Sequence, residues 1–269
     1  MTLREAVALL TEAGIESAVY DARELFMRVG GLGRGEVISP NASCELPSLC
    51  EAVKRRAKRE PLQYIIGEVG FWRETYTVTP DCLIPRPDTE VLVEYAVKHI
   101  PKGAKFVDLC TGSGCIAIST LKSTDETTAL AVDISDGALN VARRNAERNG
   151  AVKRIELIKA DVTETAVTDS CFAVLSNPPY VTSEAYRTLM PEIYFEPEIA
   201  FVGGEDGLRF YKRITELYRS VIADEGFIAF EIGYDQADAL TLIAENNEMT
   251  IEIIKDLSGN DRVAVLKKR

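Results

Sequence analysis

Residues 106–114 read Phe-Val-Asp-Leu-Cys-Thr-Gly-Ser-Gly, an apolar run that ends in a turn of small residues. The run from Ala104 to Cys110 predicts a buried strand, and the following SGCIAISTLKS predicts a helix. A strand, a glycine-containing turn and a helix in this order let backbone N–H groups approach a ligand closely. The stretch therefore predicts an α/β fold with a ligand site after this strand.

The alternation of strand and helix continues to the end of the chain. Helices are predicted from Asp88, which we expect to be a cap, from Ser135, and over residues 206–224. The further predicted strands are LAVDI, IELIKAD, CFAVLS, GFIAFEIG, MTIEIIKD and DRVAVLKK. This pattern predicts a parallel sheet with helices on both faces, whose last two strands are antiparallel because only the short turn LSGN joins them. We expect a seven-stranded, mostly parallel, Rossmann-like sheet in a domain of residues 88–269.

The first part of the chain has a different pattern. Thr2 and Glu5 have the form of a capping box, Ser17 is expected to cap a second helix, and Pro47 is expected to open a third helix. Residues 1–65 therefore predict a small helical domain. Residues 66–87 hold the aromatic, alternating stretch EVGFWRETYTVTP, which predicts a β-hairpin linking the two domains.

Charge and composition limit the possible functions. The net charge is −11, and an acidic surface repels nucleic-acid phosphates, so we expect no direct DNA partner. The basic run Lys54–Arg59 is an exception, and it is either a solvated helix face or a contact with RNA or an acidic partner. No apolar run is long enough to span a membrane, and the N-terminus has no secretory h-region. We expect a cytoplasmic, monomeric enzyme.

The cysteine pattern argues against a metal site. None of the six cysteines forms a C-x-x-C pair, and His99 is the single histidine. We expect reduced cysteines that serve as small apolar packing residues, with no bound metal.

Asp133 ends the next predicted strand after the glycine turn, where a carboxylate can hold both hydroxyls of a ribose. This spacing predicts a nucleoside site, for which a nicotinamide dinucleotide and S-adenosylmethionine are the candidates. A dinucleotide fold requires a third glycine, whereas position 117 is alanine. The sulfonium cation of S-adenosylmethionine suits a site with Asp108 in an acidic domain. We therefore favour S-adenosylmethionine.

The tetrad Asn177-Pro178-Pro179-Tyr180 directly follows the predicted strand CFAVLS. Two successive prolines fix φ near −65°, and the tetrad falls at the carboxyl end of a strand, where open α/β sheets bind ligands. A rigid loop without a binding role is the alternative interpretation. We expect a preorganised substrate site.

The motifs DLCTGSG, AVDIS, KAD and NPPY, in this order, resemble those of class I S-adenosylmethionine-dependent methyltransferases that act on planar nitrogen. The stretches FWRETYTVTPDCLIPRPDTE, EPEIAFVGGEDGL and FEIGYDQ are similar to those of the release-factor glutamine N5-methyltransferases, and the resemblance covers nearly the whole chain. It implies methylation of the side-chain amide of the glutamine in a Gly-Gly-Gln segment of peptide-chain release factors. Two alternatives remain: an adenine or cytosine amino-methyltransferase of nucleic acid, which shares NPPY, and a non-enzymatic module that binds S-adenosylmethionine.

The resemblance also implies roles for individual residues. The carbonyl groups of Asn177 and Pro178 would accept the two N–H groups of the substrate amide while Tyr180 packs on its flat face, and these three form the catalytic set. The substrate-binding set adds Pro179, Arg86 and Glu90. The cofactor-binding set is Asp108, Cys110, Thr111, Gly112, Ser113, Gly114, Asp133, Asp161, Val162 and Asn177. For Asp161 there are two interpretations: it accepts from the adenine amino group, or it is a solvated strand end. Glu231 and Gln236 would be structural supports.

Three positions depart from the family pattern. Arg73 follows Phe71-Trp72 where the family tends to have glycine. Cys110 stands where the family usually has glycine, which costs roughly 1 kcal/mol if the position needs a positive φ. Val162 stands where some members have an aromatic residue stacked on adenine. None of the three departures removes a group that we expect to do chemistry, and those at Cys110 and Val162 concern cofactor affinity.

Overall fold

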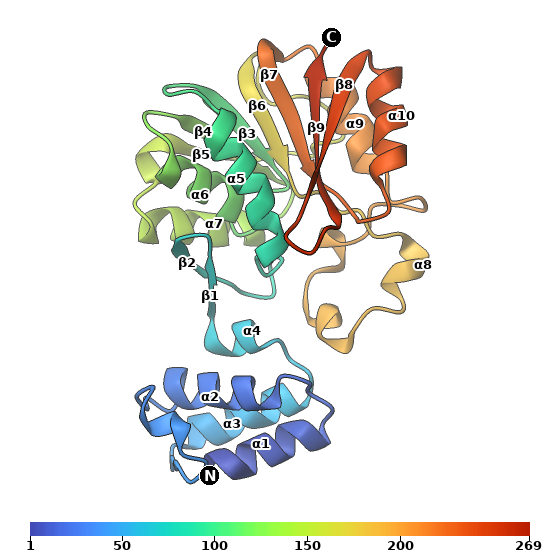
Figure 1. Cartoon of the computed structure of the whole chain (residues 1–269). Helices are drawn as coiled ribbons and strands as arrows, with labels where there is room; N and C mark the ends of the chain where they lie inside the picture. The colour runs from blue at the N-terminus through green and yellow to red at the C-terminus, as the bar shows by residue number, and fades with distance from the viewer. The chain divides into compact units, whose positions relative to one another are not determined.

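A computed structural model describes residues 1–269, and the chain divides into two compact units. The first unit comprises Met1–Glu68 and Met190–Phe195, and the second comprises Val69–Leu189 and Glu196–Arg269. Figure 1 labels their elements.

The first unit is helical and has its own apolar core. Its helices are α1 (Leu3–Glu12), α2 (Ala18–Arg28), α3 (Pro47–Ala57) and α4 (Leu62–Ile66), with the 3₁₀ turns η1 (Glu36–Ile38) and η4 (Pro191–Phe195). The predicted capping box of Thr2 and Glu5 is confirmed, whereas Ser17 makes no side-chain capping bond. The pattern did not predict α4, which is shorter than two helical turns and too short to show a period.

The basic run on α3 is largely neutralised inside this unit. Arg56 is only 7% exposed, and its Nε lies 2.6 Å from Asp21 Oδ2. Glu192 pairs with both Arg56, at 3.1 Å, and Arg59, at 2.9 Å. Arg55 pairs with a neighbouring glutamate, which leaves Lys54 and Lys58 as the exposed cations of the run. The three arginines of the run are therefore held in ion pairs within the unit, while Lys54 and Lys58 remain exposed.

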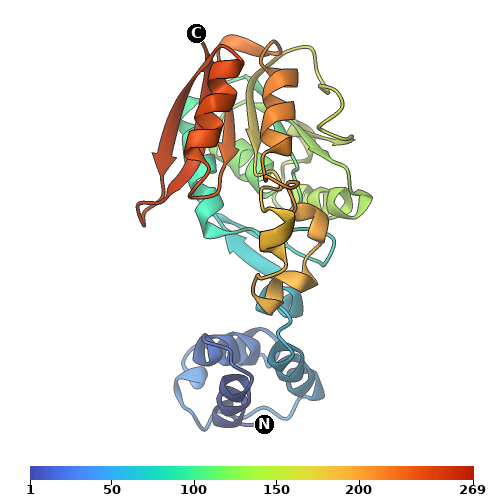
Figure 2. The same cartoon turned by 90° about the vertical axis from the view of Figure 1, so that its right-hand side faces the viewer.

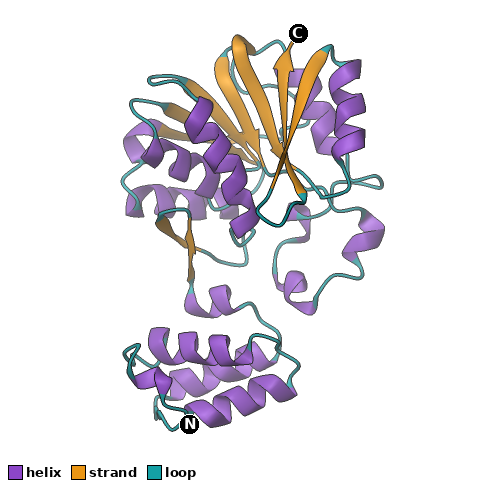
Figure 3. Ribbon diagram, in the orientation of Figure 1, coloured by secondary structure: helices purple, strands orange, loops and turns teal.

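The second unit is built on the predicted seven-stranded sheet (Figure 3). The strands are β3 (Lys105–Leu109), β4 (Thr128–Asp133), β5 (Ile155–Lys159), β6 (Cys171–Ser176), β7 (Ile222–Glu231), β8 (Met249–Lys255) and β9 (Asp261–Lys268). Their order in the sheet is β5-β4-β3-β6-β7-β9-β8. The pairings from β5 to β7 are parallel, and β8 pairs antiparallel with β9, as predicted. β9 also pairs antiparallel with β7.

Helices cover both faces of the sheet because successive strand residues point to opposite sides. Phe106 belongs to the core under α5 (Glu90–His99), α6 (Cys115–Ser123) and α7 (Asp136–Arg148), whereas Val107 belongs to the core under α9 (Arg209–Tyr218) and α10 (Ala237–Asn246). Figure 2 shows α9 and α10 side by side. None of the helices combines the length and apolar character that crossing a bilayer requires.

Two element boundaries differ from the prediction. The helix predicted over residues 206–224 spans Arg209–Tyr218, because Ile222 already pairs with Cys171 and the sheet takes the residues after it. Asp88 lies within the 3₁₀ turn η2 (Pro87–Thr89) and does not cap α5, whereas Ser135 does cap α7. The remaining short elements are η3 (Val152–Arg154), α8 (Ser183–Tyr186) and η5 (Glu198–Ala200).

The predicted hairpin forms from β1 (Glu68–Phe71) and β2 (Glu74–Thr77) and is anchored in the core of the second unit. Tyr76 is fully buried, and its hydroxyl lies 2.6 Å from Ser119 Oγ. Asn145 on α7 holds the backbone of Thr77 on both sides, accepting from its N–H and donating to its carbonyl. These bonds fix the loop that follows the hairpin and reaches the site described next.

Candidate functional site

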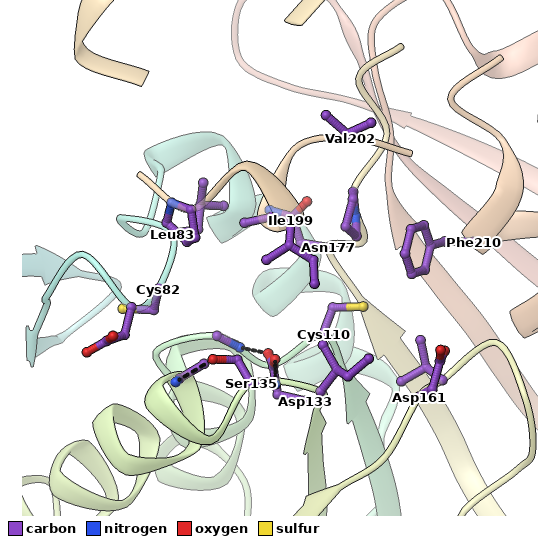
Figure 4. A pocket seen from close by; sticks show the side chains of 18 of the residues that line it. Cys82, Leu83, Cys110, Asp133, Ser135, Asp161, Asn177, Ile199, Val202 and Phe210 are labelled. Carbon is purple, nitrogen blue, oxygen red and sulfur yellow. Dashed lines mark hydrogen bonds between the residues drawn. The ribbon is translucent and has the colours of Figure 1, made fainter. Parts of the chain in front are cut away.

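A cavity lies where β3, β4, β5 and β6 end at one edge of the sheet (Figure 4). The residues after these strands line it: Cys110, Gly112, Asp133, Ile134, Ser135, Ala138, Ala160, Asp161, Val162, Asn177 and Pro179. The rest of the wall is formed by Asp81, Cys82, Leu83, Pro197, Ile199, Ala200, Val202, Arg209 and Phe210. The cavity thus brings together part of the predicted nucleoside site and part of the predicted substrate tetrad.

The turn after β3 has the left-handed backbone that small residues permit. Cys110, Gly112 and Gly114 have φ of 59°, 54° and 81°. Gly114 also lacks room for a side chain, since an added Cβ would lie 3.0 Å from Ile118 Cδ1. Cys110 therefore occupies a position that favours glycine, at a cost of roughly 1 kcal/mol.

Asp108 supports this turn from behind and does not line the cavity. It is fully buried, and its Oδ2 accepts from Thr111 Oγ1 at 2.6 Å and from the N–H of Ala117 at 3.2 Å. Its Oδ1 and the buried Oγ of Ser113 have no hydrogen-bond partner. Burial raises the pKa of Asp108 to about 7. Asp108, Thr111, Ser113 and Gly114 thus shape the turn, while Cys110 and Gly112 face the cavity.

Asp133 lies on the cavity wall with both carboxylate oxygens oriented by the backbone. Oδ2 accepts from the N–H of Gly112 at 2.9 Å, and Oδ1 accepts from the N–H of Ser135 at 2.9 Å (Figure 4). Burial raises the pKa of Asp133, and these bonds oppose the rise. The geometry fixes the carboxylate at the end of β4, where the ribose hydroxyls are expected.

Asp161 and Val162 line the cavity beside the end of β5. Asp161 Oδ1 accepts from both the N–H and the hydroxyl of Thr163, and these bonds lower its pKa. Val162 is 4% exposed and presents an apolar surface. Both predicted residues therefore line the same cavity as Asp133.

Some residues of the tetrad after β6 line the cavity, and Tyr180 supports them from behind. Asn177 and Pro179 line the cavity, and the Nδ2 of Asn177 donates to Thr89 Oγ1 at 3.3 Å. Tyr180 does not line it: its hydroxyl donates to Glu231 Oε1 at 3.5 Å, and its carbonyl accepts from Gln236 Nε2 at 3.2 Å. In this structure Tyr180 fixes the tetrad backbone rather than forming the cavity wall.

Glycines of the stretch VGGEDGL let a second loop approach the tetrad. An added Cβ at Gly203 would lie 2.4 Å from the carbonyl oxygen of Pro179, and one at Gly207 would lie 2.3 Å from that of Tyr180. The N–H of Val181 also donates to the carbonyl of Phe201 at 2.8 Å. This close packing adds to the rigidity that the prolines give the tetrad.

Arg86 and Glu90 do not line the cavity. Arg86 pairs with Glu196, which also accepts from the N–H of Ile84 at 2.9 Å. Glu90 accepts from the N–H of Trp72 at 2.7 Å and so anchors the hairpin. Both residues hold segments that lead to the cavity, and neither reaches it directly.

Several wall residues were not predicted. Asp81, Cys82 and Leu83 lie in the loop after the hairpin, Pro197 to Val202 lie in the segment after the tetrad, and Arg209 and Phe210 begin α9. Most of them lie in or next to two stretches that resemble the family, FWRETYTVTPDCLIPRPDTE and EPEIAFVGGEDGL. Their position in or next to these family-like stretches could have indicated them, but it assigned no role to individual side chains.

The wall chemistry fits S-adenosylmethionine. Three carboxyl groups and one guanidinium line the cavity, from Asp81, Asp133, Asp161 and Arg209, which favours a cationic ligand. The left-handed turn lets the backbone come close, and Val162 and Phe210 offer apolar surface to a flat base. The donor set therefore agrees with a nucleoside that carries a positive charge.

Comparisons with known proteins agree with this geometry. The family model described as PrmC N-terminal domain matches residues 2–67, and the one described as Methyltransferase small domain matches residues 87–195. The release factor glutamine methyltransferase of Caulobacter vibrioides is 36% identical over 264 residues, 95% of this chain and 91% of that protein. The one of Geobacter sulfurreducens is 37% identical over 260 residues, 94% of this chain and 91% of that protein.

A solved structure supports the fold alone. The ribosomal protein L11 methylase from Lactobacillus delbrueckii subsp. bulgaricus has a TM-score of 0.53 and 20% sequence identity, covering 71% of this chain and 84% of that chain.

Proposed function

The chain belongs to the release factor glutamine methyltransferase family, and from this premise we propose that it methylates a glutamine side-chain amide of peptide-chain release factors. The methyl donor is S-adenosylmethionine, and the acceptor is the amide nitrogen, N5, of the glutamine in the Gly-Gly-Gln segment. The observation that carries the proposal is the opening of Asn177 and Pro179 into the same cavity as Asp133 and the glycine turn.

An amide nitrogen is a poor nucleophile because its lone pair is delocalised into the carbonyl group. The protein must hold the NH₂ group so that the lone pair faces the methyl group. The Asn177 side-chain carbonyl and the Pro178 backbone carbonyl would each accept one of its N–H groups. Because the prolines, Gly203 and the bonds to Tyr180 already hold this segment, the acceptors need not be ordered during the reaction.

The cofactor would be held by the residues after β3, β4 and β5. Cys110 and Gly112 present the turn, Asp133 would accept from the ribose hydroxyls, and Asp161 and Val162 would contact the adenine. When bound, S-adenosylmethionine supplies an electrophilic methyl group on a positively charged sulfur. The acidic cavity wall favours that charge over the neutral product.

We also propose that residues 1–65 select the protein substrate. A cavity that accepts one amide cannot distinguish the glutamines of different proteins, so a second contact surface must supply the choice. The helical unit carries exposed cations at Lys54 and Lys58 in an otherwise acidic chain. A reaction on a translation factor would take place in the cytoplasm.

A side-by-side transfer assay with labelled methyl groups tests the proposal. A release factor and a duplex DNA are offered to the same enzyme at equal concentration, and we expect label in the release factor alone. A release factor whose Gly-Gly-Gln glutamine is replaced by glutamate is the matched control and should stay unlabelled. Label in the DNA would instead identify an amino-methyltransferase of nucleic acid.

A further inference from the structure

Two loop segments that are distant in sequence supply part of the cavity wall. The first is residues 81–83, after the hairpin, and the second is residues 197–202, after η4. Figure 4 shows Leu83 of the first segment and Ile199 of the second among the side chains of the lining. Strand ends are held by the hydrogen bonds of the sheet, whereas a loop that lines a cavity needs another anchor.

Glu196 joins these two segments. It directly precedes the second segment and is 4% exposed. Its Oε2 accepts from the N–H of Ile84, the residue after the first segment, at 2.9 Å, and its Oε1 accepts from the guanidinium of Arg86. A backbone N–H and a guanidinium can only donate, so both oxygens of the carboxyl group serve as acceptors. One buried side chain therefore holds the ends of both wall segments.

The second segment is also tied to the tetrad. The N–H of Val181, the residue after Tyr180, donates to the carbonyl of Phe201 at 2.8 Å, and the N–H of Gly203 donates to the carbonyl of Val181 at 2.9 Å. The wall between Glu196 and Gly203 is thus held at both ends. Its near end is fixed to the loop after the hairpin, and its far end is fixed to the substrate tetrad.

The charge of Glu196 is less important than its acceptor oxygens. Burial raises the pKa of Glu196, and the guanidinium of Arg86 opposes the rise. The bond from the N–H of Ile84 needs only an acceptor oxygen, which a neutral carboxyl group also offers. Because Ile84 is 1% exposed, its N–H would have no bulk water to replace Glu196.

We infer that Glu196 is a positioning residue that holds the wall segment of residues 197–202 in place beside the tetrad. The residues before it, Met190–Phe195, belong to the first unit, so Glu196 is the residue at which the chain returns to the second unit. Glu196 does not line the cavity and acts through the two segments that it joins. The catalytic consequence rests on the proposed function, whereas the hydrogen bonds are a property of the free enzyme.

Substitutions in the full-length protein test the inference. Glu196→Met keeps an unbranched side chain of similar length and removes both acceptors. Glu198→Met is the matched control, because Glu198 lies in the same segment, is exposed and does not line the cavity. A double variant, Glu196→Met with Arg86→Met, removes both charges of the pair, a replacement that is often neutral for stability. Thermal melting confirms that each variant is folded.

Hydrogen exchange of the Ile84 amide is the first readout and needs no substrate. We expect faster exchange in Glu196→Met and in the double variant, because neither can accept from this N–H, and wild-type exchange in Glu198→Met. The Val107 amide in the central strand β3 is the internal reference, since it responds to the stability of the whole unit. Unchanged exchange at Ile84, or equal acceleration at Ile84 and Val107, would overturn the inference.

Single-turnover transfer to a Gly-Gly-Gln peptide at saturating S-adenosylmethionine is the second readout. We expect Glu196→Met and the double variant to slow transfer by roughly tenfold or more, because a displacement of about 1 Å in a site can cost about 10²-fold. Glu198→Met should stay near wild type. A folded double variant that transfers at the wild-type rate would overturn the positioning role. If the wild-type enzyme does not methylate glutamine, the proposed function fails, while exchange at Ile84 still decides whether Glu196 holds the wall.

Discussion

Asp108 is a buried residue whose ionisation is coupled to folding. Its pKa is raised by burial from 3.8 to about 7, and its Oδ1 has no hydrogen-bond partner. Between these two pH values the folded protein keeps a proton that the unfolded chain has lost. The stability that this proton provides is present at low pH and is lost as pH rises through about 7.

Asp108→Asn should therefore change how stability depends on pH. The free energy of unfolding of the wild type, relative to this neutral variant, should fall between about pH 4 and 7, by at most ~1.4 kcal/mol per pH unit. Urea denaturation across this range measures the difference. Asp169→Asn, which changes an exposed carboxyl group, is the control and should give parallel curves. Parallel curves for Asp108→Asn as well would show that its carboxyl group does not titrate in this range.

Asn177 is the residue that the proposed chemistry needs most. Asn177→Ala removes one acceptor for the substrate amide while the turn and Asp133 remain in place. Methyl transfer should fall by about 10²-fold or more, and S-adenosylhomocysteine binding, measured by calorimetry, should change far less. A variant that retains more than about a tenth of the wild-type rate would remove Asn177 from the chemistry.

At the scale of elements, the loop that contains Gly203 depends on close backbone approach. Gly203→Ala would place a Cβ 2.4 Å from the carbonyl oxygen of Pro179 and 2.9 Å from the Cα of Tyr180. Because these neighbours are backbone atoms, the tetrad must shift. We expect a loss of about 1–3 kcal/mol in the free energy of unfolding together with slower transfer.

Gly70→Ala is the matched control for this substitution. No atom lies within 4 Å of the position that its added Cβ would take, and its φ is not positive. Denaturation and transfer assays on the two variants are compared directly. If Gly203→Ala and Gly70→Ala have the same free energy of unfolding and the same transfer rate, close packing of this loop does not hold the tetrad.

The elements that the sequence predicts best are those with a strong period or a local capping signal. The seven strands and the Ser135 cap depend on neighbouring residues, and both are confirmed. The predicted length of α9 was wrong because sheet pairing at Ile222 overrides helical periodicity. Local pattern alone cannot show whether such residues join the helix or the strand.

The candidate site was predictable only where its residues follow strands. Cys110, Asp133 and Asp161 lie at the carboxyl ends of predicted strands, and Asn177 directly follows one. All four do line one cavity. Thr89 was missed because it meets Asn177 across 88 residues of sequence, and no local pattern carries such a contact. The resemblance supplied residues in the right motifs, but it could not say which of them face the cavity.

At the scale of the whole molecule, the proposed division of labour separates chemistry from substrate choice. Charge reversal at Lys54 and Lys58 should slow transfer to an intact release factor more than transfer to a short Gly-Gly-Gln peptide. Surface charges chiefly govern encounter, so the loss should shrink as salt is added. Arg56 is unsuitable for this test because it is buried in ion pairs, and its replacement would disturb the fold.

Reversal of Lys122 and Lys153 is the control for this experiment. Both are exposed lysines of the second unit and make no ion pair. We expect their reversal to change the transfer rates to peptide and to intact factor by the same factor. The double variant at Lys54 and Lys58 is compared with it at low and high salt. Equal slowing on peptide and intact factor would show that Lys54 and Lys58 have no part in substrate choice.

The position of the transferred methyl group tests the central claim most directly. A release factor is incubated with the enzyme and S-adenosylmethionine, digested, and analysed by tandem mass spectrometry. The account predicts one added methyl group, on the side-chain amide nitrogen of the glutamine in the Gly-Gly-Gln segment. A methyl group on another residue, on a carboxyl oxygen or on the backbone, or an unmodified segment after complete cofactor turnover, would contradict it.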